Sequence, residues 1–139
     1  MSSVPKWKQG KSPAEFLKVA REVKIMTVRK SNKIPHKLWR GMAEPMIRQA
    51  NDAKSLIIQG NSINPQNRRE AEDRKRCFKN ARAILYSLGS NVDDLLEIKE
   101  EISIGYEAID EWTAIITKLI LLMDGVMDSD ARRYRELPE

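Results

Sequence analysis

Apolar side chains recur along this 139-residue chain at steps of three, four and seven positions, the spacing of a helix packed on other helices. The clearest example begins in residues 64–88, with apolar residues at Ala71, Phe78, Ala81, Leu85, Leu88, Val92 and Leu95. We expect this helix to begin at Asn64-Pro65, with Asn64 as its N-terminal cap, and to run to near Glu100.

Residues 12–30 predict an earlier helix. Ser12-Pro13-Ala14-Glu15 is typical of a helix start, because serine caps the helix, proline suits its first position and glutamate bonds back to the cap. One side of this helix carries the apolar residues Phe16, Val19, Ala20, Val23 and Met26. We therefore expect that side to be buried against other helices.

Residues 34–61 predict the helix between these two, opening at Ile34-Pro35 and ending at Gly60-Asn61. Its apolar side is formed by Leu38, Met42, Met46, Ala50, Ala53 and Ile57, and it is widened by Trp39, Ala43 and Ile47. Pro45 has no backbone N–H to donate, so we expect a kink there.

The last helix is predicted from near Ile102-Ser103 to residue 127. It keeps a seven-residue repeat of mostly apolar positions: Ile102, Gly105, Ile109, Trp112, Ile116, Leu119, Met123 and Val126. Because no stretch of the sequence alternates with a period of two, strands are not expected. Four long helices joined by short loops predict an all-α fold, an antiparallel four-helix bundle.

Length and composition indicate one domain, since a chain of 139 residues buries roughly two-thirds of its unfolded surface on folding. We expect a flexible basic arm at residues 1–11, the bundle at 12–127 and a mobile charged tail at 128–139. The longest apolar run is about half the length of a bilayer span, so no membrane contact is expected. The single cysteine, Cys77, excludes an intramolecular disulfide and favours the cytoplasm.

Charge is distributed very unevenly along the chain. The net charge is +5, but residues 1–82 contain 20 Lys and Arg against 7 Asp and Glu, and the remainder contains 5 against 13. A basic half of this kind favours a polyanionic partner. The acidic half could also face the basic half of a neighbouring copy.

The basic residues with the strongest pattern are Arg68, Lys75, Lys79 and Arg82, whose spacing places them along one side of the third helix. We predict nucleic-acid binding by Arg68, Arg69, Lys75, Arg76, Lys79 and Arg82 there, and by Lys33, Lys37 and Arg40 near the start of the second helix. The first helix adds Lys18, Arg21, Lys24, Arg29 and Lys30. The simpler interpretation is a solvated helix face that nearby acids partly neutralise.

Phosphate contacts by such residues supply affinity that does not depend on sequence and that falls with salt. Aromatic residues suited to base stacking are few on this surface, with Tyr86 continuing the basic stripe and Trp7 in the N-terminal arm. We therefore expect recognition of backbone and shape rather than of bases. The expected partner is RNA, with DNA left open as a second polyanion.

Arg74 interrupts the apolar pattern of the third helix, since it falls between Ala71 and Phe78. A charge at such a position is costly unless it is paired. One interpretation is that the arginine reaches solvent near the start of the helix. The other is a buried pair with an acid of the last helix or of another subunit.

No catalytic group, metal site or cofactor is expected. One histidine, His36, and Cys77 do not match the ligand spacings of a zinc site, and no glycine-rich phosphate loop is present. The acids Asp93, Asp94 and Glu97 are more typical of a solvated face than of a cation site. Arg29 and His36 have the spacing used by helical ribonucleases of the HEPN type, so RNA cleavage is kept as an alternative.

Several of these features occur together in one family. The relevant residues are Ile34-Pro35, Trp39-Arg40, residues 53–57, Gly60-Asn61-Ser62-Ile63, Arg74, Ala81, Ala83 and Trp112. In their order and spacing, residues 13–127 resemble the four-helix-bundle family of the accessory variability determinant (Avd) of diversity-generating retroelements. Proteins encoded in bacterial 23S rRNA intervening sequences belong to the same family.

This resemblance implies a homopentameric ring with a basic surface and no catalytic centre. It implies a bacterial or phage accessory protein that binds reverse transcriptase and template RNA during mutagenic cDNA synthesis. The acidic second half of this chain departs from the more pervasive positive charge of the retroelement proteins. The alternatives are an intervening-sequence protein of the same fold, a ribonuclease, and an assembly adaptor that contacts only protein.

Overall fold

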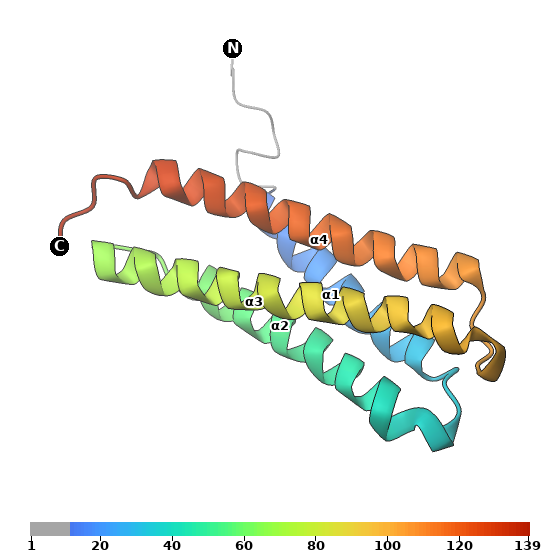
Figure 1. Ribbon diagram of the computed structural model, residues 1–139. Coiled ribbons are helices and arrows are strands. Elements are labelled where there is room, and N and C mark those ends of the chain that lie inside the picture. Colours follow the sequence, from blue (N-terminus) through green and yellow to red (C-terminus); the bar gives the residue numbers. More distant parts are fainter. Residues whose placement is uncertain (1–11) are drawn as a thin grey trace, which may run out of the picture.

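A computed structural model describes residues 12–139, and every regular element within them is helical (Figure 1). The four long helices are α1 (Ser12–Ser31), α2 (Glu44–Ser62), α3 (Arg68–Asp94) and α4 (Tyr106–Arg133). They form a four-helix bundle in which α1 and α3 each contact both α2 and α4. The all-α prediction is confirmed, and the predicted arm at residues 1–11 lies outside the described residues. No helix of this part of the chain is long and apolar enough to span a membrane.

The core is built from the apolar positions that the periodicity predicts. In α3, Phe78, Ala81, Leu85, Leu88 and Val92 are all fully buried. The rings of Phe16 and Phe78 meet edge to face with centroids 5.5 Å apart, which joins α1 to α3 across the centre of the bundle. At Gly60 of α2, an added Cβ would lie 2.6 Å from Cε1 of Phe78. Close approach of α2 to α3 therefore requires glycine at that position.

A short chain of buried polar groups joins α1 to α4. The Trp112 indole N–H donates to Oγ1 of Thr27 at 3.0 Å, and that hydroxyl donates to the Val23 carbonyl at 2.7 Å. Thr27 is fully buried, whereas Met26, which the apolar pattern placed in the core, is half-buried. A threonine occupies this buried position because its hydroxyl accepts the hydrogen bond of the Trp112 indole N–H.

The entry to α2 is irregular, and the prediction of one continuous helix from residue 34 is corrected here. A 3-10 turn, η2 (His36–Leu38), is followed by a π-helical turn, η3 (Trp39–Ala43), before α2 begins. The Glu44 N–H donates to the Trp39 carbonyl, five residues back. Pro45 then falls in the first turn of α2, directly after the π-helical turn.

The start of α3 also differs from the prediction, because its cap is Asn67 and not Asn64. The Asn67 Oδ1 accepts a hydrogen bond from the Glu70 N–H at 2.9 Å. The Glu70 carboxylate in turn accepts one from the Gln66 N–H at 2.8 Å. This reciprocal pair satisfies the Glu70 N–H in the first turn of the helix and the Gln66 N–H just before the cap.

The connection from α3 to α4 is a 3-10 segment, η4 (Leu95–Glu101), in which Ile98 leaves helical geometry at φ −116° and ψ 20°. Consequently α3 ends at Asp94 rather than near Glu100, and α4 begins at Tyr106 rather than near Ile102. At its other end α4 continues to Arg133, so the predicted end of the bundle at residue 127 is too early.

Candidate nucleic-acid interface

The solvent-facing side of α3 carries the basic residues that the sequence singles out. Because the apolar seam of α3 faces the core, residues between the seam positions must point outward. Exposed side chains are found at Arg68, Arg69, Lys75, Arg76 and Lys79, and Arg82 is half-buried. The structure therefore brings these six predicted residues onto one helix surface.

Three of the six are paired with acids. Arg68 lies 2.8 Å from Glu139, Arg76 lies 3.1 Å from Asp73, and Arg82 lies 2.7 Å from Asp124. The first two pairs are exposed, and such pairs contribute only about 0–1 kcal/mol, so a phosphate could compete for either arginine. The Arg82 pair is less exposed and links α3 to α4.

The other three basic residues of this surface are Arg69, Lys75 and Lys79. None of them forms an ion pair with any residue of the described chain, 12–139. They lie within the first half of α3, at the end of the bundle where α4 ends. We call Arg69, Lys75 and Lys79 the α3 basic group.

The remaining predicted site residues, Lys33, Lys37 and Arg40, lie elsewhere. They are exposed in the segment between α1 and α2, at the end of the bundle where α3 ends and α4 begins (Figure 1). The α3 basic group begins at the other end of the bundle, where the C-terminus also lies. The structure does not bring the nine predicted residues together into one site.

Basic residues of α1 form a third location. α1 and α3 are diagonal in the bundle, so their outward faces point in different directions. Arg21, Arg29 and Lys30 line a hollow on α1, and Lys30 lies 3.7 Å from Glu111 of α4. Positive charge is thus distributed around the bundle. Among the described residues Lys18, Arg21, Lys24 and Arg29 of α1 form no ion pair, like the three residues of the α3 basic group.

Arg74 is buried, and it makes the most connected polar contact of the described chain. Its Nε lies 2.7 Å from Asp130 Oδ2 and its Nη2 lies 3.2 Å from Oδ1, so the pair is bidentate. Its Nη1 donates to the carbonyls of Gly60 and Ile63, both at 3.2 Å. The guanidinium carbon also lies 5.0 Å from the centroid of the Phe78 ring. The interpretation of Arg74 as a buried pair with an acid of the last helix is confirmed.

This contact joins three helices at one end of the bundle. Arg74 belongs to α3, Asp130 to α4, and the two carbonyls to the end of α2 and the loop after it. A guanidinium is suited to the position because its planar fork matches a carboxylate and still leaves donors for backbone oxygens. The last turns of α4 are therefore held against the start of α3.

A hollow of about 260 Å³ lies where these turns meet α3. Its lining includes the basic residues Arg68, Lys75 and Arg135 and the half-buried ring of Tyr134. Sequence reasoning assigned Tyr134 and Arg135 to a mobile tail and so missed them as part of this surface. The run Arg132-Arg133-Tyr134-Arg135 was the available signal, since it places an aromatic ring among cations.

The residues considered for catalysis or metal binding are Arg29, His36, Cys77 and the acids Asp93, Asp94 and Glu97. Arg29 and His36 are both exposed, and no hydrogen bond joins them within the described residues. Within residues 12–139, no three His, Cys, Asp or Glu side chains come together as a candidate metal site. Cys77 is a free, half-buried thiol beside the core of α3.

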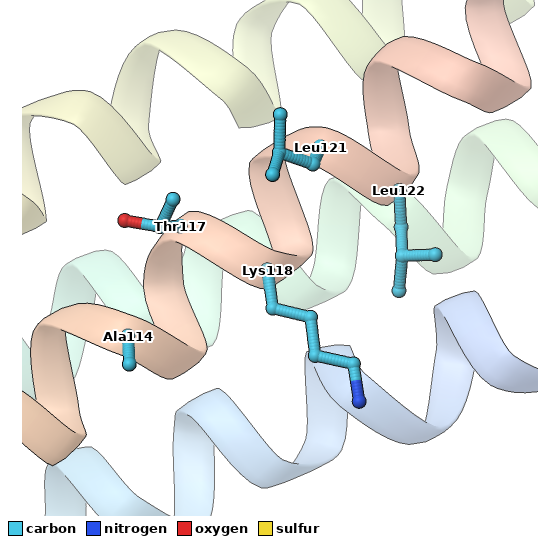
Figure 2. Close-up of a pocket in the computed structure, with 5 residues that line it drawn as sticks. All are labelled: Ala114, Thr117, Lys118, Leu121 and Leu122. Atoms are coloured by element: carbon cyan, nitrogen blue, oxygen red, sulfur yellow. The ribbon is translucent and has the colours of Figure 1, made fainter.

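An apolar hollow on α4 is a different kind of surface. It is lined by Ala114, Thr117, Lys118, Leu121 and Leu122 (Figure 2). Lys118 points toward α1, where its Nζ lies 3.3 Å from Glu15, whereas Leu121 points away from α1. Leu121 is 65% exposed, the largest fraction among the exposed large apolar residues. The hollow and Leu121 together give this part of α4 an apolar surface.

The chain matches no protein-family model, no curated protein and no solved structure. The function is therefore inferred from the charge and geometry of this bundle, together with the resemblance carried by its spaced residues.

Proposed function

We propose that this protein is a non-catalytic nucleic-acid-binding protein whose α3 surface binds the phosphate backbone of RNA, with DNA as a second polyanion. The observation that carries this proposal is the α3 basic group: three exposed cations on one helix, unpaired within residues 12–139. Neutralising phosphates with such residues releases counterions, which supplies affinity without sequence preference. Arg68 and Arg76 flank the group in weak exposed pairs and add to the same surface.

The more specific form of the proposal is an accessory protein of a diversity-generating retroelement. It would act in the cytoplasm as an antiparallel bundle that binds template RNA and reverse transcriptase during mutagenic cDNA synthesis. The resemblance of residues 13–127 to the Avd family supports this form. A reverse-transcriptase gene and a repeated template beside this reading frame would add independent support, and their absence would favour an intervening-sequence protein of the same fold.

We further propose that the protein self-associates into a ring, with five subunits as the resemblance implies. The apolar hollow around Leu121 supports contact with another protein surface, since a large exposed apolar side chain gains free energy when covered. Light scattering on the purified protein is expected to give about five times the chain mass of 16.0 kDa. A mass equal to that of a single chain would contradict the ring.

Salt dependence tests the phosphate contacts directly. We expect affinity for single-stranded RNA to fall at least about tenfold between roughly 50 mM and 200 mM salt, because several cations release counterions on binding. Fluorescence anisotropy of a labelled RNA, measured at four or more salt concentrations, gives the slope. An affinity that stays constant over this range would rule out phosphate contacts as the source of binding.

A further inference from the structure

The hollow between α3 and the end of α4 combines three features that recognition of a single nucleotide requires. Its basic residues are Arg68 and Lys75 of α3 and Arg135 of the turn that follows α4. Its apolar lining includes Ala71 of α3 and Met127 of α4. Cations on two sides of an apolar floor can hold a phosphate while a flat ring lies between them.

Tyr134 supplies the aromatic face. It is half-buried in the hollow, and the guanidinium carbon of Arg133 lies 5.8 Å from its ring centroid. A base stacked on a tyrosine gains about 1–3 kcal/mol whatever its identity, because every base has a π face. Stacking of this kind adds affinity without sequence preference, as phosphate contacts do.

The position of Tyr134 is set by the buried pair beneath it. The Tyr134 N–H donates to the Asp130 carbonyl at 2.9 Å, and the Asp130 carboxylate is bound by Arg74. The buried pair of Arg74 and Asp130 therefore holds the turn that carries Tyr134 against α3. A preformed wall of this kind costs little entropy when a ligand binds.

The charge in the hollow favours an anion despite two acids in its lining. Asp130 is one, and its carboxylate already accepts both hydrogen bonds of the Arg74 fork. Glu72 is the other, and it is exposed. Arg68 donates through Nη1 to Glu139, an exposed pair that a phosphate could replace. Lys75 has no acidic partner among residues 12–139.

We infer that this hollow takes one unstacked nucleotide of a single-stranded RNA, with its base on Tyr134 and its phosphate against Lys75 and Arg68. The volume of about 260 Å³ lies below the roughly 300–1,000 Å³ of pockets that enclose a drug-sized ligand, so it suits one base with part of its sugar. A paired base is held in its duplex stack and cannot enter. The inference rests on the proposed RNA binding and specifies the form of RNA that is preferred.

The test compares a single-stranded RNA with a blunt RNA duplex of the same length, using wild-type protein and two tyrosine variants. Tyr134→Leu keeps an apolar side chain and removes the stacking face, so affinity for the single strand should fall about tenfold, within the range expected for one stacked base. Affinity for the duplex should not change. Tyr134→Phe should retain wild-type affinity for both.

Tyr106→Leu is the matched control, because Tyr106 is an exposed tyrosine with the Lys99 ammonium 3.8 Å from its ring centroid, at the other end of α4. It should leave both affinities unchanged. Circular dichroism checks that each variant keeps its helical content. If Tyr134→Leu binds the single strand as tightly as wild type, or loses affinity for both RNAs equally, the nucleotide site is wrong while RNA binding stands. If wild type binds neither RNA, the proposed function fails as well.

Discussion

Replacing Arg74 by methionine should lower the free energy of unfolding by about 3–5 kcal/mol, the cost of removing one partner from a buried ion pair. The substitution leaves the Asp130 carboxylate without its bidentate donor in a position where its side chain is only 14% exposed. It also removes the Arg74 donor from the Ile63 carbonyl and from the Gly60 carbonyl, although the latter still accepts from the Ile63 N–H at 3.2 Å. An unpaired buried acceptor costs about 1–3 kcal/mol, and a charged one costs more. Chemical denaturation followed by circular dichroism measures the change.

Arg76→Met is the matched control, since Arg76 lies two residues away in the same helix and forms an exposed pair with Asp73. We expect that change to cost no more than about 1 kcal/mol. Adding Asp130→Asn to Arg74→Met should recover part of the lost stability, because the unpaired charge is removed. Equal effects of the Arg74 and Arg76 substitutions would contradict a structural role for the buried pair.

The second large effect is expected on RNA binding. Changing Arg69, Lys75 and Lys79 together to glutamine removes three phosphate contacts, and so should reduce the salt slope for single-stranded RNA by about two units. At low salt this corresponds to a loss of affinity on the order of a hundredfold. The three residues are exposed and unpaired in the described part of the chain, so stability should change little. Arg82 is left unchanged because replacing it would leave the Asp124 carboxylate without its ion-pair partner.

A control with the same change in net charge is available at the other end of the bundle. Lys33, Lys37 and Arg40 changed together to glutamine also remove three positive charges from exposed positions. If the α3 face is the principal contact, this variant should keep most of the affinity and most of the salt slope. Equal losses from both triple variants would mean that net charge, and not the α3 surface, determines binding.

Much of the fold was predictable because burial of a helix face is encoded locally. Trp112, Ile116 and Leu119 repeat at helical spacing and are all buried, as the pattern indicates. Helix ends were less predictable. Asn64 and Asn67 are both capping residues by type, and Glu70 selects the second by bonding back to the Gln66 N–H. Ile98 fits the apolar pattern but lies where α3 has already ended.

The candidate site was predictable only in part. The spacing of Lys75 and Lys79 places both on one face of α3, because side chains four residues apart lie one turn apart on a helix. Spacing cannot reveal which cations meet an acid from another helix. The pair between Arg82 and Asp124 joins positions 42 residues apart, and it removes Arg82 from the free charge of the surface.

The sequence by itself determined that this chain forms long helices with buried apolar seams and that its first 82 residues carry excess positive charge. Tertiary structure alone decided the partner of Arg74, which is Asp130, 56 positions away in a segment without strong periodicity. It also separated Lys33, Lys37 and Arg40 from the α3 basic group. The reason is physical: periodicity records which side of a helix is buried, whereas packing between helices decides which residues of different helices meet.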